Sequence, residues 1–151
     1  MKMPTNSSLY WISFAPTFLL LGYLVWRYVG VVRSKPRFAR SEVIFEEWFA
    51  SGCSQKNLLT KIGGGRNCVR LVVTPGFLWV TTWFPFSLIA PLYDMEHVVP
   101  LSAIASVKKD KSWGALAFLV TFTTQSGQSR TLRLLPKHPD ALAQSLGLDA
   151  T

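Results

Sequence analysis

The sequence predicts a single transmembrane α-helix followed by an α+β, mainly antiparallel β domain, and three observations point to this arrangement. A long apolar run occupies residues 9–32. From about residue 41 the apolar residues alternate with polar ones, which is typical of strands that bury one face. The segment 139–146 has the pattern of a short helix. We expect the sheet to bend into a roll or small barrel that this last helix caps.

The apolar run reads LYWISFAPTFLLLGYLVWRYVGVV and contains one charge, Arg27. At about 1.5 Å per residue it is longer than the roughly 30 Å hydrocarbon core of a bilayer. Aromatic residues stand near both ends, as in membrane-interface belts. A cleaved signal peptide is the weaker alternative, because only Lys2 precedes the run and no small-residue cleavage site follows it. We therefore assign residues 1–33 to an N-terminal tail and a transmembrane helix.

Basic residues flank this run unequally. Lys2 stands alone before it, whereas four basic residues follow within a few positions: Arg33, Lys35, Arg37 and Arg40. Positive charge near a span favours the cytoplasmic side. We expect a single-pass protein of the inner (cytoplasmic) membrane, with the N-terminus outside and the C-terminal domain in the cytoplasm. Residues 34–41 form a basic juxtamembrane linker, and 42–148 form the β domain.

The elements of this domain follow from periodicity and turn chemistry. Thr74-Pro75-Gly76 is a turn signal between two strands rich in β-branched and aromatic residues. The segment Gln125–Gln128 turns the chain within a second hairpin. A helical turn is expected at 55–62, before three glycines. We predict strands at 43–49, 68–74, 78–83, 98–107, 116–123 and 132–134.

Four segments of the domain resemble a bacterial PH-like domain of the pleckstrin-homology and GRAM-like group. They are VRLVVTPGFLWVTTW, VVPLSAIASVKK, FLVTFTTQSGQSRTLRLLP and PKHPDALAQSL. The resemblance covers roughly residues 42–148. It implies a PH-like roll with a C-terminal capping helix, no shared catalytic residues, and members that bind lipids or proteins, often beside transmembrane helices.

The connection 84–93, FPFSLIAPLY, departs from that resemblance because it is unusually apolar. A second span is disfavoured by Pro85 and Pro91. The connection is either part of the core or exposed to a membrane interface or a protein partner, since large exposed apolar patches mark such contacts. The candidate contact residues are Phe84, Phe86, Leu88, Ile89 and Leu92.

The formal net charge of +8 favours anionic partners, acidic lipid headgroups first. Glycines 63–65 stand among basic residues and could hold a lipid headgroup, but they resemble a phosphate cradle only loosely. No P-loop spacing is present, and a flexible turn between two elements is the favoured interpretation. The candidate headgroup contacts are Arg33, Lys35, Arg37, Arg40, Lys56, Lys61, Arg66, Lys108, Lys109 and Lys111.

No motif indicates catalysis. Asp94 and His97 are three residues apart, but no third metal ligand is evident and the segment reads as a polar loop. Cys53 and Cys68 are expected to be reduced thiols. We expect no enzyme activity, no metal, no cofactor and no nucleic-acid partner. The expected function is a membrane-anchored, non-catalytic binding module for acidic lipid, a membrane protein partner or both. The alternative is a small accessory or structural subunit of a larger membrane protein complex.

Overall fold

Seven antiparallel strands form one sheet in the part of the chain that the structure describes. The computed structural model describes residues 7–83, 85–88, 90–112 and 115–148. The strand order is β4-β3-β2-β1-β7-β6-β5, so β4 and β5 are the two edges of the sheet. This confirms the prediction of a mainly antiparallel β domain. The strands are β1 (Phe45–Ser54), β2 (Gly65–Val73), β3 (Phe77–Thr82), β4 (His97–Pro100), β5 (Ile104–Ser112), β6 (Ala115–Thr123) and β7 (Ser129–Leu135).

The chain divides into two units, Met1–Lys35 and Pro36–Thr151. The first unit contains the helix α1 (Ser7–Ser34), and the second contains the sheet and two shorter helices, α2 (Leu58–Ile62) and α3 (Pro139–Ser145). Four short 3₁₀ helices complete the described elements: η1 (Arg40–Glu42), η2 (Phe86–Leu88), η3 (Ala90–Tyr93) and η4 (Leu101–Ala103).

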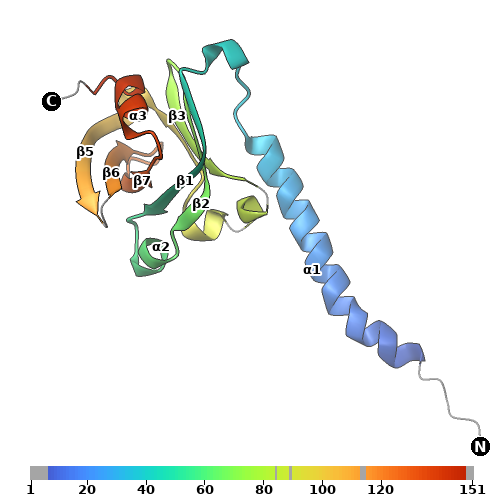
Figure 1. Cartoon of the computed structure of the whole chain (residues 1–151). Helices are drawn as coiled ribbons and strands as arrows, with labels where there is room; N and C mark the ends of the chain where they lie inside the picture. Colours follow the sequence, from blue (N-terminus) through green and yellow to red (C-terminus); the bar gives the residue numbers. More distant parts are fainter. Residues whose placement is uncertain (1–6, 84, 89, 113–114, 149–151) are drawn as a thin grey trace, which may run out of the picture. The chain divides into compact units, whose positions relative to one another are not determined.

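The core lies inside the curve of the sheet. Figure 1 shows the strands β5, β6 and β7 curving away from β1, β2 and β3, with α3 across one end of the interior. Leu71 of β2, Phe118 of β6 and Leu132 of β7 are fully buried in one cluster. Leu142 and Ala143 of α3 join the same cluster, so the predicted closing helix is confirmed. Its first residue is Pro139, where the missing N–H costs nothing.

One predicted strand is wrong in its extent. The segment 98–107 was expected to be continuous, but the structure divides it into β4, the 3₁₀ helix η4 and β5. Proline provides no N–H for a strand ladder, and the chain turns directly after Pro100. As a result β4 pairs with β3, while β5 pairs with β6 at the opposite edge of the sheet.

The expectation of a transmembrane helix is not borne out. The helix α1 covers the apolar run, but no helix among the described residues is long and apolar enough to cross a membrane. The cellular topology that assumed this span remains an untested prediction.

The apolar connection after β3 folds into the two short 3₁₀ helices η2 and η3 rather than into an α-helix. Ser87 and Ala90 are buried, whereas Phe86 is 39% exposed. The connection is therefore partly core and partly surface. Phe84 and Ile89 lie outside the described residues, as do the side chains of Leu88 and Leu92.

Candidate binding surface and ligand groove

A β-bulge in β1 turns two aromatic residues outward together. Glu47 pairs with Leu71 and Ala50 pairs with Val69, so the two residues between them, Trp48 and Phe49, oppose a single residue of β2. Phe49 has a φ of 63°, a left-handed conformation that side-chain-bearing residues rarely adopt. The bulge breaks the alternation of the strand. Both rings consequently lie at the surface, 44% and 46% exposed.

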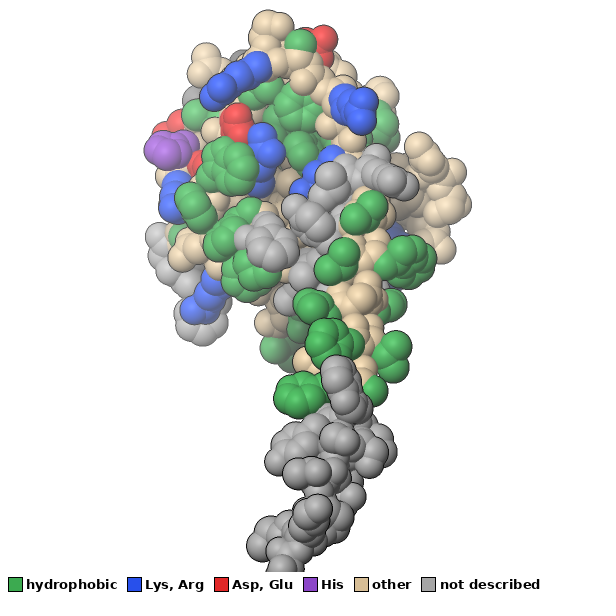
Figure 2. Space-filling model, turned by 90° about the vertical axis from the view of Figure 1, so that its right-hand side faces the viewer, with side chains coloured by type: hydrophobic (Ala, Val, Ile, Leu, Met, Phe, Trp, Pro, Cys, Tyr) green, Lys and Arg blue, Asp and Glu red, His purple; other side chains and the backbone are tan. Residues whose placement is uncertain are grey.

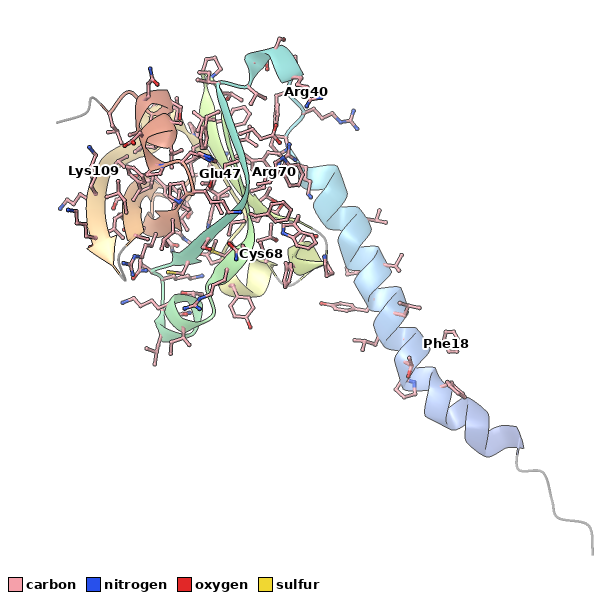
Figure 3. The ribbon with its side chains drawn as sticks, in the orientation of Figure 1. Phe18, Arg40, Glu47, Cys68, Arg70 and Lys109 are labelled. Carbon is pink, nitrogen blue, oxygen red and sulfur yellow. The ribbon has the colours of Figure 1, made fainter. Side chains whose placement is uncertain are left out.

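Arg70 is the residue that opposes the bulge, and its guanidinium group is held from three sides. Its Cζ atom lies 4.2 Å from the centroid of the Trp48 ring and 5.2 Å from that of Trp79. Its Nε and Nη2 atoms donate to Glu46 Oε1 at 3.0 and 2.7 Å. Figure 3 labels Arg70 on the outer side of β2. A guanidinium stacked on indole rings is attracted by their π-electrons, so Arg70 and Trp48 stabilise one another.

The aromatic surface continues from the bulge toward η2. Phe49 meets the ring of Trp83 with centroids 5.8 Å apart, and Trp83 meets Phe86 at 5.3 Å. The Nε1 atom of Trp83 donates to the carbonyl oxygen of Asn67 at 3.3 Å, which fixes the ring. Lys137 Nζ lies 5.4 Å from the centroid of Phe49. We call this set the aromatic-cationic face: Trp48, Phe49, Arg70, Trp83, Phe86 and Lys137.

Phe38 covers another part of the outer sheet surface. It packs edge-on against Phe77 and Trp79, with centroids 5.9 and 5.6 Å away. Trp79 is only 3% exposed. This part of β3 is therefore closed to a partner. Figure 2 shows hydrophobic side chains on the face turned to the viewer, with Lys and Arg side chains between them.

Two hollows meet at the glycine turn that joins α2 to β2. An apolar pocket of about 210 Å³ lies on one side of Gly64, Gly65 and Arg66. A groove of about 350 Å³ lies on the other side of the same three residues. The pocket is also lined by Cys68, Thr82, Phe86, Ala90, Tyr93 and Met95.

The groove is basic. Lys61, Arg66 and Arg133 line it, and no carboxylate is among the described residues that do so. Arg133 Nη2 donates to Asp110 at 2.9 Å, but its Nε atom is buried and has no partner among the described residues. The Cys53 thiol also lines the groove, and its burial raises its pKa although the positive charge of Arg133 opposes this. The thiol is therefore protonated at neutral pH.

Asp94 occupies a polar junction that ties three parts of the chain together. Ser54 Oγ donates to Asp94 Oδ2 at 2.9 Å, and Arg130 Nη1 donates to Asp94 Oδ1. Burial alone would raise the pKa of Asp94, but the hydrogen bond from Ser54 and the charge of Arg130 outweigh burial and lower it. The carboxylate therefore holds β1, β7 and the segment before β4 in place.

His97 completes this junction through the backbone of Asp94. Its Nε2–H donates to the carbonyl oxygen of Asp94 at 2.8 Å, while the nearest carboxylate oxygen of Asp94 is 3.7 Å away. Burial lowers the pKa of His97, so the ring is neutral at pH 7. Ser54 Oγ donates to the Asp94 carboxylate and accepts the backbone N–H of Lys56 at 3.3 Å. Among the described residues there is no group of three or more side chains suited to a metal ion.

Within the Pro36–Thr151 unit, the structure does not gather the predicted basic residues into one surface. Lys61 and Arg66 lie together at the groove. Lys108, Lys109 and Lys111 lie on the edge strand β5, and Figure 3 shows Lys109 well away from Arg70. The others are elsewhere: Lys56 in the loop after β1, Lys35 and Arg37 before η1, Arg40 in η1, and Arg33 with its side chain outside the described residues.

The residues of the aromatic-cationic face, except Phe86, were missed by the sequence reasoning. One feature of the sequence could have indicated this face: two large aromatic residues, Trp48 and Phe49, are adjacent in a segment that is predicted to be a strand. Two consecutive apolar residues in an alternating strand mark a possible bulge. Arg70 gave no signal, because its stacking partners come from a different strand and from the bulge.

Comparison with known protein families finds no family model that matches the chain, and comparison with curated proteins finds no matching sequence. The resemblance to the PH-like group with a transmembrane anchor is therefore corrected on both counts. No family model supports the domain assignment, and no described helix is able to span a membrane. What the chain contains is a seven-stranded antiparallel domain with a short C-terminal helix.

Proposed function

We propose that the Pro36–Thr151 unit is a non-catalytic binding module that attaches reversibly to acidic lipid surfaces through the aromatic-cationic face. The observation that carries this proposal is the bulge, which exposes Trp48 and Phe49 side by side with Arg70 and Lys137. Trp is enriched where proteins meet the headgroup region, since its ring is apolar and its N–H is polar. The positive charge of Lys137 suits an anionic headgroup layer, while that of Arg70 is already paired with Glu46.

The expected strength is moderate. An aromatic side chain buries 150–250 Å², so two half-exposed rings would remove roughly 150–250 Å² from water, worth about 4–6 kcal/mol at about 25 cal/mol per Å². Each basic side chain near the surface adds about 1 kcal/mol. Such a sum supports reversible attachment. The rings are already held by Arg70 and Trp83, so little side-chain entropy is lost on binding.

The net charge of the chain agrees with this proposal. A formal charge of +8 attracts the chain to an anionic surface from a distance, and salt screens this attraction. The aromatic contacts act only at short range and are insensitive to salt. Attachment should accordingly fall with ionic strength without disappearing.

The test is sedimentation of the full chain with vesicles. Binding to vesicles containing phosphatidylserine should exceed binding to pure phosphatidylcholine vesicles. The double variant Trp48→Ala, Phe49→Gly should bind at least tenfold more weakly. The control Leu58→Ala removes a side chain that is 73% exposed but lies outside the face, and it should bind like the wild type. Equal binding by the double variant and the wild type would reject the proposal.

A second candidate function is an accessory subunit of a larger protein complex, and the surface of α1 favours it. Nine large apolar side chains of this helix are at least 40% exposed: Phe14, Phe18, Leu19, Leu20, Leu21, Tyr23, Val25, Trp26 and Val29. Such a surface marks a contact with something apolar. Figure 3 labels Phe18 on this helix.

This alternative is tested by purification in a mild detergent. A fixed stoichiometry with named subunits, lost on changing Phe18 and Trp26 to Ala but kept in the Trp48→Ala, Phe49→Gly variant, would support it. A chain that elutes without protein partners and retains acidic lipid would favour the lipid-binding module instead.

A further inference from the structure

The glycine turn lies between two hollows of opposite character. The pocket on one side is mostly apolar, with Ala90, Met95 and Phe86 in its lining. The groove on the other side has three cationic side chains in its lining. Gly64, Gly65 and Arg66 line both. A molecule that lies across this turn would therefore place an apolar part and an anionic part in matching surroundings.

Two polar atoms at these hollows have no partner among the described residues. Thr82 is 3% exposed and lines the apolar pocket, and its hydroxyl is unpaired. The buried Nε atom of Arg133 belongs to a side chain that lines the groove, and it is unpaired as well. Buried polar groups in native proteins are almost always hydrogen-bonded, and each exception requires an explanation.

We infer that the glycine turn is a binding site for a single anionic amphiphile. Its phosphate-type headgroup lies in the groove against Lys61, Arg66 and Arg133, and the adjoining apolar part enters the pocket beside Thr82. The inference rests on the proposed lipid-binding function and specifies where a single headgroup would bind. It adds a specific headgroup site to a surface that otherwise recognises only charge and apolar character.

The glycines have a structural role that this site uses. A Cβ atom on Gly64 would lie 2.6 Å from Cys53 Cβ, and one on Gly65 would meet the sulfur of Cys68. The backbone therefore approaches the Cys53 and Cys68 side chains closely, and a larger residue at either position would displace a wall of one of the hollows. Packing explains the glycines, but it does not explain the three cations of the groove.

The size of the hollows limits the ligand. The groove, at about 350 Å³, falls in the range of small-molecule sites, about 300–1,000 Å³. The pocket, at about 210 Å³, holds on the order of seven water-sized groups at about 30 Å³ each. The site thus suits a headgroup with the first few carbons of a chain, and the remainder of a long chain would stay outside.

The test measures the binding of soluble probes to the full chain by isothermal titration calorimetry. Dihexanoyl phosphatidic acid below its micelle concentration should bind, and dihexanoyl phosphatidylcholine should bind at least tenfold more weakly. Inorganic phosphate should bind at least a hundredfold more weakly than the phosphatidic acid. Phosphate binding as tight as the amphiphile would overturn the inference, because the pocket would then contribute nothing.

Two variants separate binding from folding. Arg66→Gln should weaken the phosphatidic acid at least tenfold, while Lys109→Gln, a control on the edge strand, should change it less than twofold. Thr82→Val should bind the ligand at least as tightly as the wild type and raise the melting temperature, because it removes an unpaired buried hydroxyl that the apolar part of the ligand cannot pair with. A Thr82→Val variant that binds at least tenfold more weakly would overturn the placement of the apolar part in this pocket.

Failure of this inference is distinguishable from failure of the proposed function. If Arg66→Gln leaves phosphatidic acid binding unchanged while Trp48→Ala, Phe49→Gly still loses vesicle binding, the module stands and the headgroup site does not. If the soluble amphiphile binds at the turn but the Trp48→Ala, Phe49→Gly variant sediments with vesicles like the wild type, the headgroup site stands and the proposed role of the aromatic-cationic face fails.

Discussion

The guanidinium carbon of Arg70 lies 4.2 Å from the centroid of the Trp48 ring. The two residues belong to the neighbouring strands β2 and β1, whose pairing register shifts by one residue at this point. The extra residue in β1 is what brings them together. With regular pairing, residue 48 would have a partner of its own and the pair Trp48-Phe49 would point to opposite faces of the sheet. The bulge thus creates the surface on which the proposed function depends.

Replacing Arg70 with Lys should weaken this surface although the charge is kept. Lysine cannot stack flat on the Trp48 ring or direct two donors at Glu46 Oε1. We expect a loss of about 1–2 kcal/mol in unfolding free energy from the cation–π and hydrogen-bond contacts. Urea denaturation followed by tryptophan fluorescence measures it. A Lys variant as stable as the wild type would show that only the charge matters.

Phe49 offers a test of the strained backbone. At a φ of 63°, glycine is free of the steric penalty that alanine suffers. Phe49→Gly should therefore be more stable than Phe49→Ala by about 1 kcal/mol, and both should lose vesicle affinity equally because both lack the ring. Thermal unfolding and vesicle sedimentation separate the two effects. An alanine variant that is the more stable of the pair would mean that the bulge is absent in solution.

Glu47 is expected to be the most sensitive carboxylate of β1. It is 5% exposed and accepts the backbone N–H groups of Lys137 and His138 at 2.7 and 2.9 Å. Glu47→Gln removes the charge and replaces one accepting oxygen with an NH₂ group, which cannot accept a backbone N–H. The unfolding free energy should fall by about 1–3 kcal/mol. Glu42→Gln, at an exposed position in η1, is the matched control and should stay within about 0.5 kcal/mol of the wild type. Chemical denaturation compares the two variants.

Stability should depend on pH through His97. Because burial lowers the pKa of His97 in the folded state, the unfolded chain takes up the proton first as the pH falls. The unfolding free energy should decrease as the pH drops below about 6.5, the ordinary histidine value. The lowered pKa of Asp94 adds a further decrease below about pH 4.

The variant His97→Gln keeps a donor for the Asp94 carbonyl oxygen but cannot titrate. Its unfolding free energy should be flat between pH 7 and 5, where that of the wild type decreases. Denaturant titrations at several pH values provide the comparison. Parallel curves for the two proteins would contradict the assignment of this dependence to His97.

The lysines of β5 should protect an edge rather than bind lipid. β5 ends the sheet, and charged side chains on an edge strand oppose pairing with other chains. Replacing Lys108, Lys109 and Lys111 with Thr should increase aggregation, measured by light scattering. Vesicle affinity of the remaining monomer should change less than threefold. A tenfold loss of affinity would instead restore these lysines as headgroup contacts.

Several elements of the fold were predictable because their signals are local. The hairpin of β6 and β7 follows from alternation and from a turn ending in Gly127, which has a φ of 77°. The closing helix follows from Pro139 and the spacing of its leucines. The strand pair β2 and β3 follows from the Thr74-Pro75-Gly76 turn. In each case neighbouring residues determine the conformation.

The candidate site was less predictable. Lys61 and Arg66 were identified from charge around the glycines, and Phe86 from the apolar connection. Their meeting with Thr82 and Arg133 was not foreseen, because those residues belong to β3 and β7. The predicted transmembrane span was based on a long apolar run with aromatic residues near both ends. No helix among the described residues is long and apolar enough to cross a membrane.

Local periodicity and turn residues thus specify where the strands and the closing helix lie, since backbone conformation responds to the next few residues along the chain. Strand register, the bulge at Trp48 and Phe49, and the contact of Glu47 with a loop 90 residues away come only from the folded sheet. They depend on the packing of the core and on the hydrogen bonds that buried donors form. Both involve contacts between segments that are distant in the sequence.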